Sequence, residues 1–574
     1  MYQRDGQIGS WWVPAMIVGA VAFAALAWGS APGLLWYDTG EFGAVAWRLS
    51  LSHPPGHPAH TMWTHAAQFV LPFGDGIFRA NLSSAVAVSF ALACLYCLLK
   101  RAKPDAPTPL IILAALTPLA IPCIYDQSIR SEVYGLQLAL SMLMTYMALR
   151  FHQTKDQRIW LIMAFCFGVA GANHSYIAVT LLCLPIASLI AGDCSLRSIG
   201  AGIVAGALGL CLYLYLPLRA LSGGLVGWGQ PDSLTRFVGT VSGQDWSRNL
   251  VPDATTDSIW PRLSALAGYI DDQLGWMFLV GLVLSIVWLI RSKQLRGPVF
   301  VLLLAMVLPF ILRLGNDFDS QNPDMGGYLA WGMVVPIIVL LYAIPFHRHR
   351  LFAWLTAVLL LSVWASWFEH ERFVIPEDRA AERYAQALLD GTVADGVLLT
   401  GDYSTTFSIW ALLSVFGERP DVSALFRGQM DQTWSRARLR RIHPEMADRL
   451  NRAPSDWVRS DVSWELGVRM ESLGELRAQL FPTALSAGIG RRWSSLEDHA
   501  QQFRVFDGAS FAGLRFKALL HLHFIDQLIA TRGPAEWVHW HLKAARTLAP
   551  NDPMLNAFDR RVRNYAAGVE PKSL

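Results

Sequence analysis

The chain has 574 residues, of which 53% are hydrophobic and 16% are charged, and its mean hydropathy is +0.33. Soluble domains carry about a quarter charged residues, so this composition indicates a chain embedded in a lipid bilayer. The formal net charge is only +3 and the sequence has no basic tract, which excludes nucleic acid as a partner.

Eleven apolar segments are long enough to cross, or nearly cross, a bilayer. They lie at 11–30, 78–99, 108–124, 133–150, 159–175, 176–192, 198–217, 268–290, 297–314, 328–345 and 351–368. The first has no clear small-residue cleavage site and is interpreted as an uncleaved anchor. The polar triplet Asn173-His174-Ser175 favours a break within 159–192, which gives two short spans rather than one long helix.

The distribution of basic residues tests this number of crossings. With the N-terminus in the cytoplasm, the inner loops are short and rich in Lys and Arg, whereas the longer outer loops carry fewer. The inner basic residues are Lys100, Arg101, Lys103, Arg150, Lys155, Arg158, Arg197, Arg291, Lys293, Arg296, Arg348 and Arg350. This asymmetry favours eleven crossings and a C-terminal part outside. No cysteine follows Cys211, which favours a bacterial inner membrane with a periplasmic exterior.

The predicted fold is therefore mainly α, a polytopic membrane protein with two parts. Residues 1–370 form the transmembrane domain, with long outer loops at 31–77 and 218–267, and residues 371–574 form a soluble exterior domain. A helix-like stretch at 377–390 and a strand-like run at 396–400 indicate a small α/β part within 377–425.

The rest of the exterior part is expected to be helical. Trp537–Pro550 resembles the second helix of a tetratricopeptide-type repeat. His521, His523, His539 and His541 lack a convincing set of metal ligands and are expected on a helix surface.

The segment after the first span carries the most chemistry. Asp38 and Glu41 lie at the outer membrane edge, and His53 and His57 follow in a proline-rich turn. A carboxylate there can act as a general base on a hydroxyl group. The alternative is a capping box, in which Asp38 caps a helix running to about Ser50 and Glu41 occupies its third position. The two interpretations are compatible.

These residues also carry a family resemblance, because several motifs follow one another in order. The motifs are Asp38–Phe42, His53–Pro58, Ser131–Tyr134, Asn173-His174, Tyr215–Arg219, Trp228–Pro231, Gly401-Asp402 and Arg419–Asp421. The set resembles a membrane family long labelled only as a domain of unknown function, whose animal members are transmembrane protein O-mannosyltransferases. It is similar more distantly to the GT-C glycosyltransferases. The resemblance covers about residues 30–425.

The resemblance implies a GT-C-like arrangement and an inverting transfer of a sugar, mannose-like, from a polyprenyl phosphate to a hydroxyl on protein or envelope glycan. By this resemblance Asp38 is the first choice of catalytic base and Glu41 the second. The partners implied are the bilayer, the lipid-linked sugar donor and the acceptor, and no metal cofactor is predicted.

Further residues are candidates for binding the donor. Arg219 at the outer end of a span and Arg130 in a short outer loop can each clamp a phosphate. Snorkelling, or ion pairing of Arg130 with Glu132 or Asp126, is the alternative. His174 can hydrogen-bond the donor, or it can simply form the turn between two spans. With His53 and His57, the candidate substrate-binding set is then His53, His57, Arg130, Glu132, His174 and Arg219.

A third acidic outer loop contains Asn316, Asp317, Asp319 and Asp324. Three carboxylates can bind a divalent cation, but a solvated loop is the more common meaning of such a run. We therefore expect no required metal here.

Two other functions compete with glycosyl transfer. A transporter or flippase of a lipid-linked intermediate fits the number of spans, although the sequence has no inverted repeat. A non-catalytic envelope scaffold fits the exterior domain, and it predicts that side chains fill any pocket under Asp38.

Overall fold

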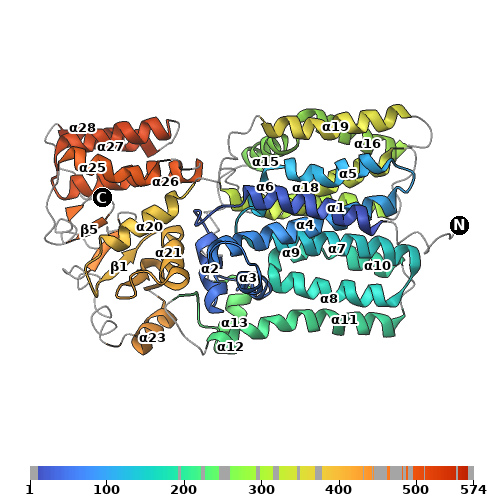
Figure 1. Ribbon diagram of the computed structural model, residues 1–574, viewed down its shortest axis with the longest axis horizontal. Coiled ribbons are helices and arrows are strands. Elements are labelled where there is room, and N and C mark those ends of the chain that lie inside the picture. The colour runs from blue at the N-terminus through green and yellow to red at the C-terminus, as the bar shows by residue number, and fades with distance from the viewer. Residues whose placement is uncertain are drawn as a thin grey trace.

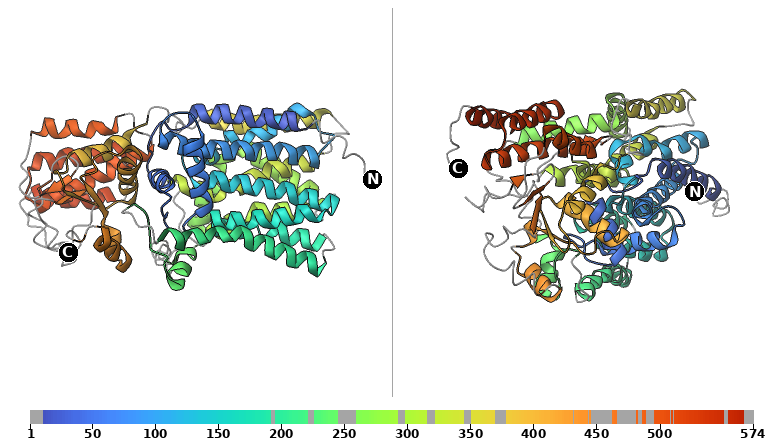
Figure 2. Two further views of the ribbon diagram at one scale, coloured as in Figure 1. Left: turned by 60° about the horizontal axis from the view of Figure 1, so that its bottom comes forward. Right: turned by 60° about the vertical axis from the view of Figure 1, so that its left-hand side comes forward.

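The computed structural model describes most of the chain, and the statements below concern these residues alone. They are 11–191, 195–220, 226–244, 259–291, 298–314, 322–344, 350–368, 378–430, 432–442, 444, 462–465, 481–482, 486–488, 495–507, 509, 511–550 and 554–566. Long helices lie side by side in one bundle, and the elements from α20 (Ala380–Asp390) onward gather at one end of it (Figures 1 and 2).

Every predicted apolar segment contains helix. The bundle consists of α1 (Trp12–Gly29), α4 (Gly76–Ala102), α5 (Thr108–Leu116), α6 (Pro122–Ser128), α7 (Val133–Thr154), α8 (Gln157–Asn173), α9 (Ser175–Thr180), α10 (Cys183–Ala191), α11 (Leu196–Leu210), α12 (Tyr215–Ala220), α15 (Ile259–Leu274), α16 (Trp276–Arg291), α17 (Pro298–Leu314), α18 (Pro323–Ala343) and α19 (Arg350–Phe368). Apart from α11 and α12, these apolar helices pack around one large hydrophobic core, as expected for an integral membrane protein.

By length and composition, four helices of the described part can cross a membrane, or up to six if each bent pair is one span. One pair bends by 77° before Pro122, which cannot continue the hydrogen-bond ladder. The other bends by 101° at Gly275, whose φ of +75° suits glycine. The remaining apolar helices are shorter, so eleven crossings stay a prediction.

The break predicted within 159–192 is confirmed. Helix α8 ends at Asn173, and His174 takes an extended conformation with φ −152° and ψ 97° before α9 begins. The Asn173 side chain donates hydrogen bonds to the Val133 carbonyl at 3.0 Å and to the Gln137 side chain at 2.9 Å, so the polar break is tied to α7.

Two short helices follow α1 at the end of the bundle nearest the C-terminal elements. They are α2 (Thr39–Arg48) and α3 (Pro58–Val70) (Figure 1). The predicted helix after Asp38 is confirmed, but the predicted capping box is wrong because the Asp38 side chain makes no capping hydrogen bond. Glu41 instead bonds to His53, whose backbone and ring return to the first turn of α2.

A five-stranded sheet lies in the C-terminal part, with strand order β2-β1-β3-β5-β4. Strands β2 (Ser423–Phe426), β1 (Val397–Thr400) and β3 (Val462–Glu465) are parallel, whereas β5 (Ser486–Gly488) and β4 (Phe481–Pro482) pair antiparallel. Helix α21 (Tyr403–Ala411) packs against β1 and β2, and α20 packs against α21. The helix expected at 377–390 and the strand expected at 396–400 are both present. The domain boundary at 370 stays a prediction.

The chain ends in packed helices α25 (Leu496–Gln502), α26 (Phe511–Ala530), α27 (Ala535–Leu548) and α28 (Met554–Ala566). The surface position expected for the histidines is wrong for two of them. His521 and His541 are 1% and 0% exposed, and they form a hydrogen-bonded chain with His499, which is 1% exposed. The sequence does not reveal this contact, because His521 and His541 lie on two different helices, α26 and α27, and meet only where these helices pack together.

Candidate active site

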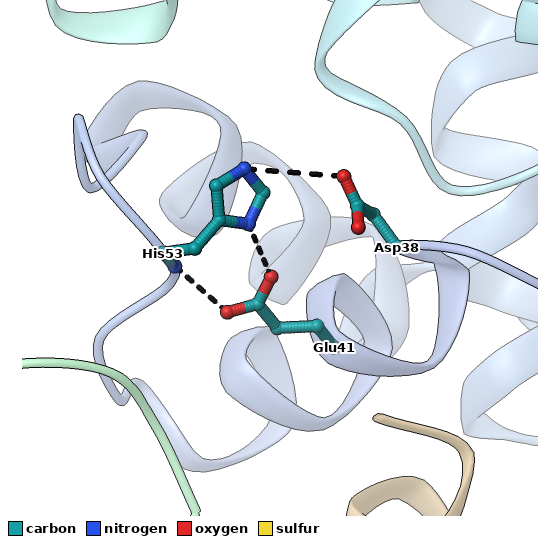
Figure 3. Close-up of side chains that lie close together, drawn as sticks. All are labelled: Asp38, Glu41 and His53. Atoms are coloured by element: carbon teal, nitrogen blue, oxygen red, sulfur yellow. Dashed lines mark hydrogen bonds and ion pairs between the residues drawn. The ribbon is translucent and has the colours of Figure 1, made fainter. Parts of the chain in front are cut away.

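The predicted first outer segment, residues 31–77, brings Asp38, Glu41 and His53 together (Figure 3). Both carboxylate oxygens of Glu41 bind His53: one accepts from its backbone N–H at 2.7 Å, and the other lies 2.5 Å from ring atom Nδ1. The opposite ring atom, Nε2, lies 3.9 Å from the Asp38 carboxylate. His53 therefore links a fully buried carboxylate to one that is 13% exposed at its side chain.

This arrangement changes the proton affinities of both partners. Burial raises the pKa of Asp38 to about 7, although the nearby His53 acts to lower it. Burial alone would lower the pKa of His53, but the charges of Glu41 and Asp38 raise it to about 9. Near neutral pH, a protonated His53 thus faces a carboxyl group that is poised to take or release a proton.

Two further carboxylates, those of Glu132 and Asp324, lie beside Asp38. The Arg130 guanidinium contacts Asp324 at 2.6 Å and lies 3.9 Å from Glu132. The predicted pairing of Arg130 with Glu132 is thus the weaker of its two ion pairs. Burial, with Asp324 nearby, holds the pKa of Glu132 well above its ordinary value.

Two sets of side chains among the described residues have the geometry to hold a metal ion. One is Asp38, Glu41 and His53, and the other is Asp38, Glu132 and Asp324, with ligand atoms within 4.8 Å of one another in each set. Asp317 and Asp319 of the predicted acidic loop lie outside the described residues. Each set already has a positively charged partner: His53 in the first set, and Arg130 beside Asp324 of the second.

A cavity of about 700 Å³ opens over these residues, between the helix bundle and the C-terminal part. Of the predicted residues, Asp38, His53, His57 and His174 line it. His57 is fixed there because its Nδ1 lies 2.7 Å from the carbonyl of Asn173, at the break between α8 and α9. Glu41, Arg130, Glu132 and Arg219 do not line the cavity.

Arg219 has a different partner from the one predicted. Its guanidinium donates to the carbonyl oxygens of Leu49 and Arg48, at the end of α2, so it fastens α12 to the first outer segment. Arg313 of α17 lines the cavity instead, and its guanidinium lies 4.8 Å from the centre of the Tyr328 ring. The sequence did contain one signal for Arg313. It is a basic residue at the predicted outer end of a span, whereas most basic residues lie on the predicted inner side.

The fold and the site define an integral membrane protein with a carboxylate–histidine cavity at one end of its helices. A family model for the N-terminal domain of protein O-mannosyl-transferase TMEM260 matches residues 38–192, which include Asp38, Glu41, His53 and His174. The protein O-mannosyl-transferase TMEM260 of Mus musculus is 23% identical over 438 residues. The family resemblance predicted from the ordered motifs is confirmed.

The match with the mouse protein covers 71% of this chain and 61% of the mouse protein. Two solved structures are also similar. ArnT from Cupriavidus metallidurans bound to undecaprenyl phosphate has a TM-score of 0.49 and 12% identity, covering 74% of this chain and 91% of ArnT. The oligosaccharyltransferase of Archaeoglobus fulgidus in complex with zinc and sulfate has a TM-score of 0.48 and 10% identity, covering 80% of this chain and 68% of that enzyme.

Proposed function

We propose that the chain is an inverting glycosyltransferase that moves a sugar from a polyprenyl phosphate to a hydroxyl acceptor, with Asp38 as the general base. One observation carries this assignment. Asp38 lines the cavity, whereas both oxygens of the second candidate, Glu41, are bound by His53. Glu41 then acts through His53 as a positioning residue.

An apolar groove supports a lipid-linked donor. It has a volume of about 620 Å³ and lies between α7, α10, α17 and α18. Val179 and Leu308 line the groove, and Tyr176 and Arg313 on the same helices line the polar cavity. A polyprenyl tail in the groove would thus place its phosphate near Arg313. Ile190 and Phe300 at the groove are 80% and 60% exposed, which suits contact with lipid.

The chemistry follows from these positions. Asp38 takes the proton from the acceptor hydroxyl as its oxygen attacks the anomeric carbon of the sugar. The bond between that carbon and the phosphate oxygen breaks, and the polyprenyl phosphate leaves with the electron pair. Arg313 faces the negative charge that develops on this phosphate, and His53 stabilises the Asp38 carboxylate before the proton arrives.

The relative's name, protein O-mannosyl-transferase, supports a mannose-like sugar and a hydroxyl on protein as acceptor. An envelope glycan is the alternative acceptor. The basic residues of the short loops support an N-terminus in the cytoplasm and a reaction on the exterior face of a bacterial inner membrane. The open cavity beside Asp38 argues against the scaffold hypothesis, which requires a filled pocket.

The test is Asp38→Asn in the full-length protein, reconstituted in nanodiscs with polyprenyl-phosphate mannose. We expect sugar release from the donor to fall by roughly 100-fold or more, since general bases contribute about 10²–10⁴ in rate. The thermal midpoint should not fall. Asp75→Asn is the matched control, because Asp75 caps α4 in the same outer segment.

Near-normal turnover of Asp38→Asn would contradict this role. Flipping of a fluorescent polyprenyl phosphate by both Asp38→Asn and the wild type, with no sugar release by either, would favour the transport hypothesis instead.

A further inference from the structure

The cavity has two walls of different chemistry. Its carboxylates, histidines and arginine all belong to the membrane helices and the first outer segment: Asp38, His53, His57, His174, Arg313 and Asp324. The opposite wall comes from the segment at Trp228 and from the C-terminal part. Its aromatic and amide residues are Trp228, Tyr403, Phe426, Gln429, Gln432 and Trp434. No carboxylate, Lys, Arg or His of the described C-terminal part lines the cavity.

The aromatic and amide wall is held in place from two sides. The Trp228 N–H donates to the Leu51 carbonyl at 2.7 Å, just before the His53 turn. Arg438, 8% exposed on α23 (Thr433–Ile442), donates to the carbonyls of Gly227 and Val226 at 3.2 Å each. The segment at Trp228 is therefore tied both to the first outer segment and to α23.

Gln429 is an unsatisfied group in this wall. It lies in α22 (Arg427–Met430), directly after the edge strand β2, and is 7% exposed. Its Nε2 is buried without a hydrogen-bond partner. A buried amide donor without a partner costs about 1–3 kcal/mol, so a ligand carbonyl placed there would recover that energy. Gly428 beside it also lines the cavity.

We propose that this wall is the acceptor subsite and binds an extended, uncharged polypeptide segment whose Ser or Thr hydroxyl faces Asp38. This inference rests on the proposed function. Gln429 donates to a backbone carbonyl of the acceptor, and Trp434 and Trp228 pack against its neighbouring residues. Charged neighbours of the hydroxyl would lose water without gaining an opposite charge from this wall. The donor phosphate takes the opposite wall, where Arg313 lies.

The experiment separates acceptor use from donor use. Full-length protein in nanodiscs receives polyprenyl-phosphate mannose, with a neutral Ala/Gly/Thr peptide as acceptor or with water alone. For Gln429→Ala and Trp434→Ala we expect the peptide KM to rise about tenfold, which corresponds to about 1.4 kcal/mol. Donor hydrolysis by water should stay within twofold of wild type. Gln386→Ala is the control, because Gln386 bonds Asp390 on the outside of α20.

A peptide with Asp on both sides of Thr should be a poorer acceptor for the wild type than the neutral peptide. An unchanged KM in both variants, or an equal loss of hydrolysis and transfer, would overturn the proposal. Use of methyl mannoside but not of the peptide would assign the wall to a glycan and overturn the polypeptide class.

A measurement of peptide binding without donor tests the acceptor subsite independently of turnover. A fluorescent form of the neutral peptide should bind Asp38→Asn, and Gln429→Ala in that background should weaken this binding about tenfold. Equal binding by both proteins overturns the acceptor subsite. Absent donor turnover together with Gln429-dependent binding would instead refute the proposed function and leave the peptide site standing.

Discussion

The backbone N–H of Tyr37 donates a hydrogen bond to the Ser404 hydroxyl at 2.6 Å, across 367 positions of the sequence. Tyr37 precedes Asp38, so α21 holds the backbone next to the candidate base. The neighbouring Trp36 is 3% exposed and stacks on Phe516 of α26 with ring centres 4.3 Å apart. The C-terminal part thus forms the support of the first outer segment as well as one wall of the cavity.

The closest approach in this contact is at Gly40 of α2. A Cβ atom there would lie 2.6 Å from the Phe407 backbone of α21, which cannot move aside alone. We expect Gly40→Ala to displace α2, lower the sugar transfer rate at least tenfold and reduce the thermal midpoint. Gly200→Ala, at an exposed helix position where a Cβ meets nothing within 4 Å, is the control. Unchanged transfer by Gly40→Ala would show that α21 does not position Asp38.

Local patterns predicted much of this molecule. Apolar runs gave the positions of the helices, because their lengths match the bilayer. The polar residues at 173–175 marked the break between α8 and α9. Asp38, His53, His57 and His174 were found because acidic and imidazole groups stand out beside apolar spans.

The remaining site residues depend on contacts between distant segments. Arg130 pairs with Asp324 across 194 positions, and no local spacing indicates that partner. Arg219 has a side chain that could bind a phosphate, but its guanidinium donates to backbone carbonyls at the end of α2. Trp228 of the aromatic and amide wall belongs to one of the ordered motifs, but no motif covers Gln429 or Trp434, so only the fold brings these residues to the cavity.

The pair formed by Glu41 and His53 should set the pH dependence of transfer. Asp38 must be deprotonated to act, so the wild-type rate should rise with pH through about 7. In Glu41→Gln, His53 loses the carboxylate that keeps it protonated. The positive charge of His53 lowers the pKa of Asp38 by more than the negative charge of Glu41 raises it, so the net result of losing both charges is a higher Asp38 pKa. The acid limb of the rate profile should therefore move to higher pH, by on the order of one unit.

The measurement is the rate of sugar release from pH 5 to 9. Glu382→Gln, which removes the ion-pair partner of the exposed Arg379, should leave the profile where it is. An acid limb in Glu41→Gln at or below the wild-type pH would exclude a charged His53 as the group that tunes Asp38.

Arg130 bears on the metal dependence of the site. Its guanidinium forms ion pairs with Asp324 and Glu132, and it supplies the positive charge that a bound cation would otherwise supply to these carboxylates. We expect wild-type transfer to be unaffected by EDTA. Arg130→Gln should lower the free energy of unfolding by about 3–5 kcal/mol, because it leaves a buried carboxylate uncompensated. Added Mn²⁺ should then raise the thermal midpoint of this variant more than that of wild type. Loss of wild-type transfer in EDTA, restored by Mn²⁺, would refute this expectation.

The buried histidine chain of the C-terminal helices should make their stability depend on pH. His541 lies with one ring nitrogen 2.8 Å from Nε2 of His499 and the other 2.7 Å from Nδ1 of His521. Three neutral imidazoles can satisfy both bonds, whereas a protonated ring has only donors. Burial lowers the pKa of His499 to about 4 and that of His521 to about 3, and it lowers the pKa of His541 as well.

The unfolded chain therefore takes up protons before the folded one. Stability is complete above the ordinary histidine pKa of about 6.5 and falls as the pH drops below it, by at most about 4 kcal/mol per unit for three protons. The hydrogen-exchange protection factors of α25, α26 and α27 should fall between pH 7 and pH 5. His521→Phe should weaken this dependence, since a ring at 521 still stacks on Phe503 but no longer titrates. His539→Gln, at an exposed position of α27, should not change it. Equal protection at both pH values, after correction for the intrinsic exchange rate, would mean that these histidines take up protons in the folded chain as readily as in the unfolded chain.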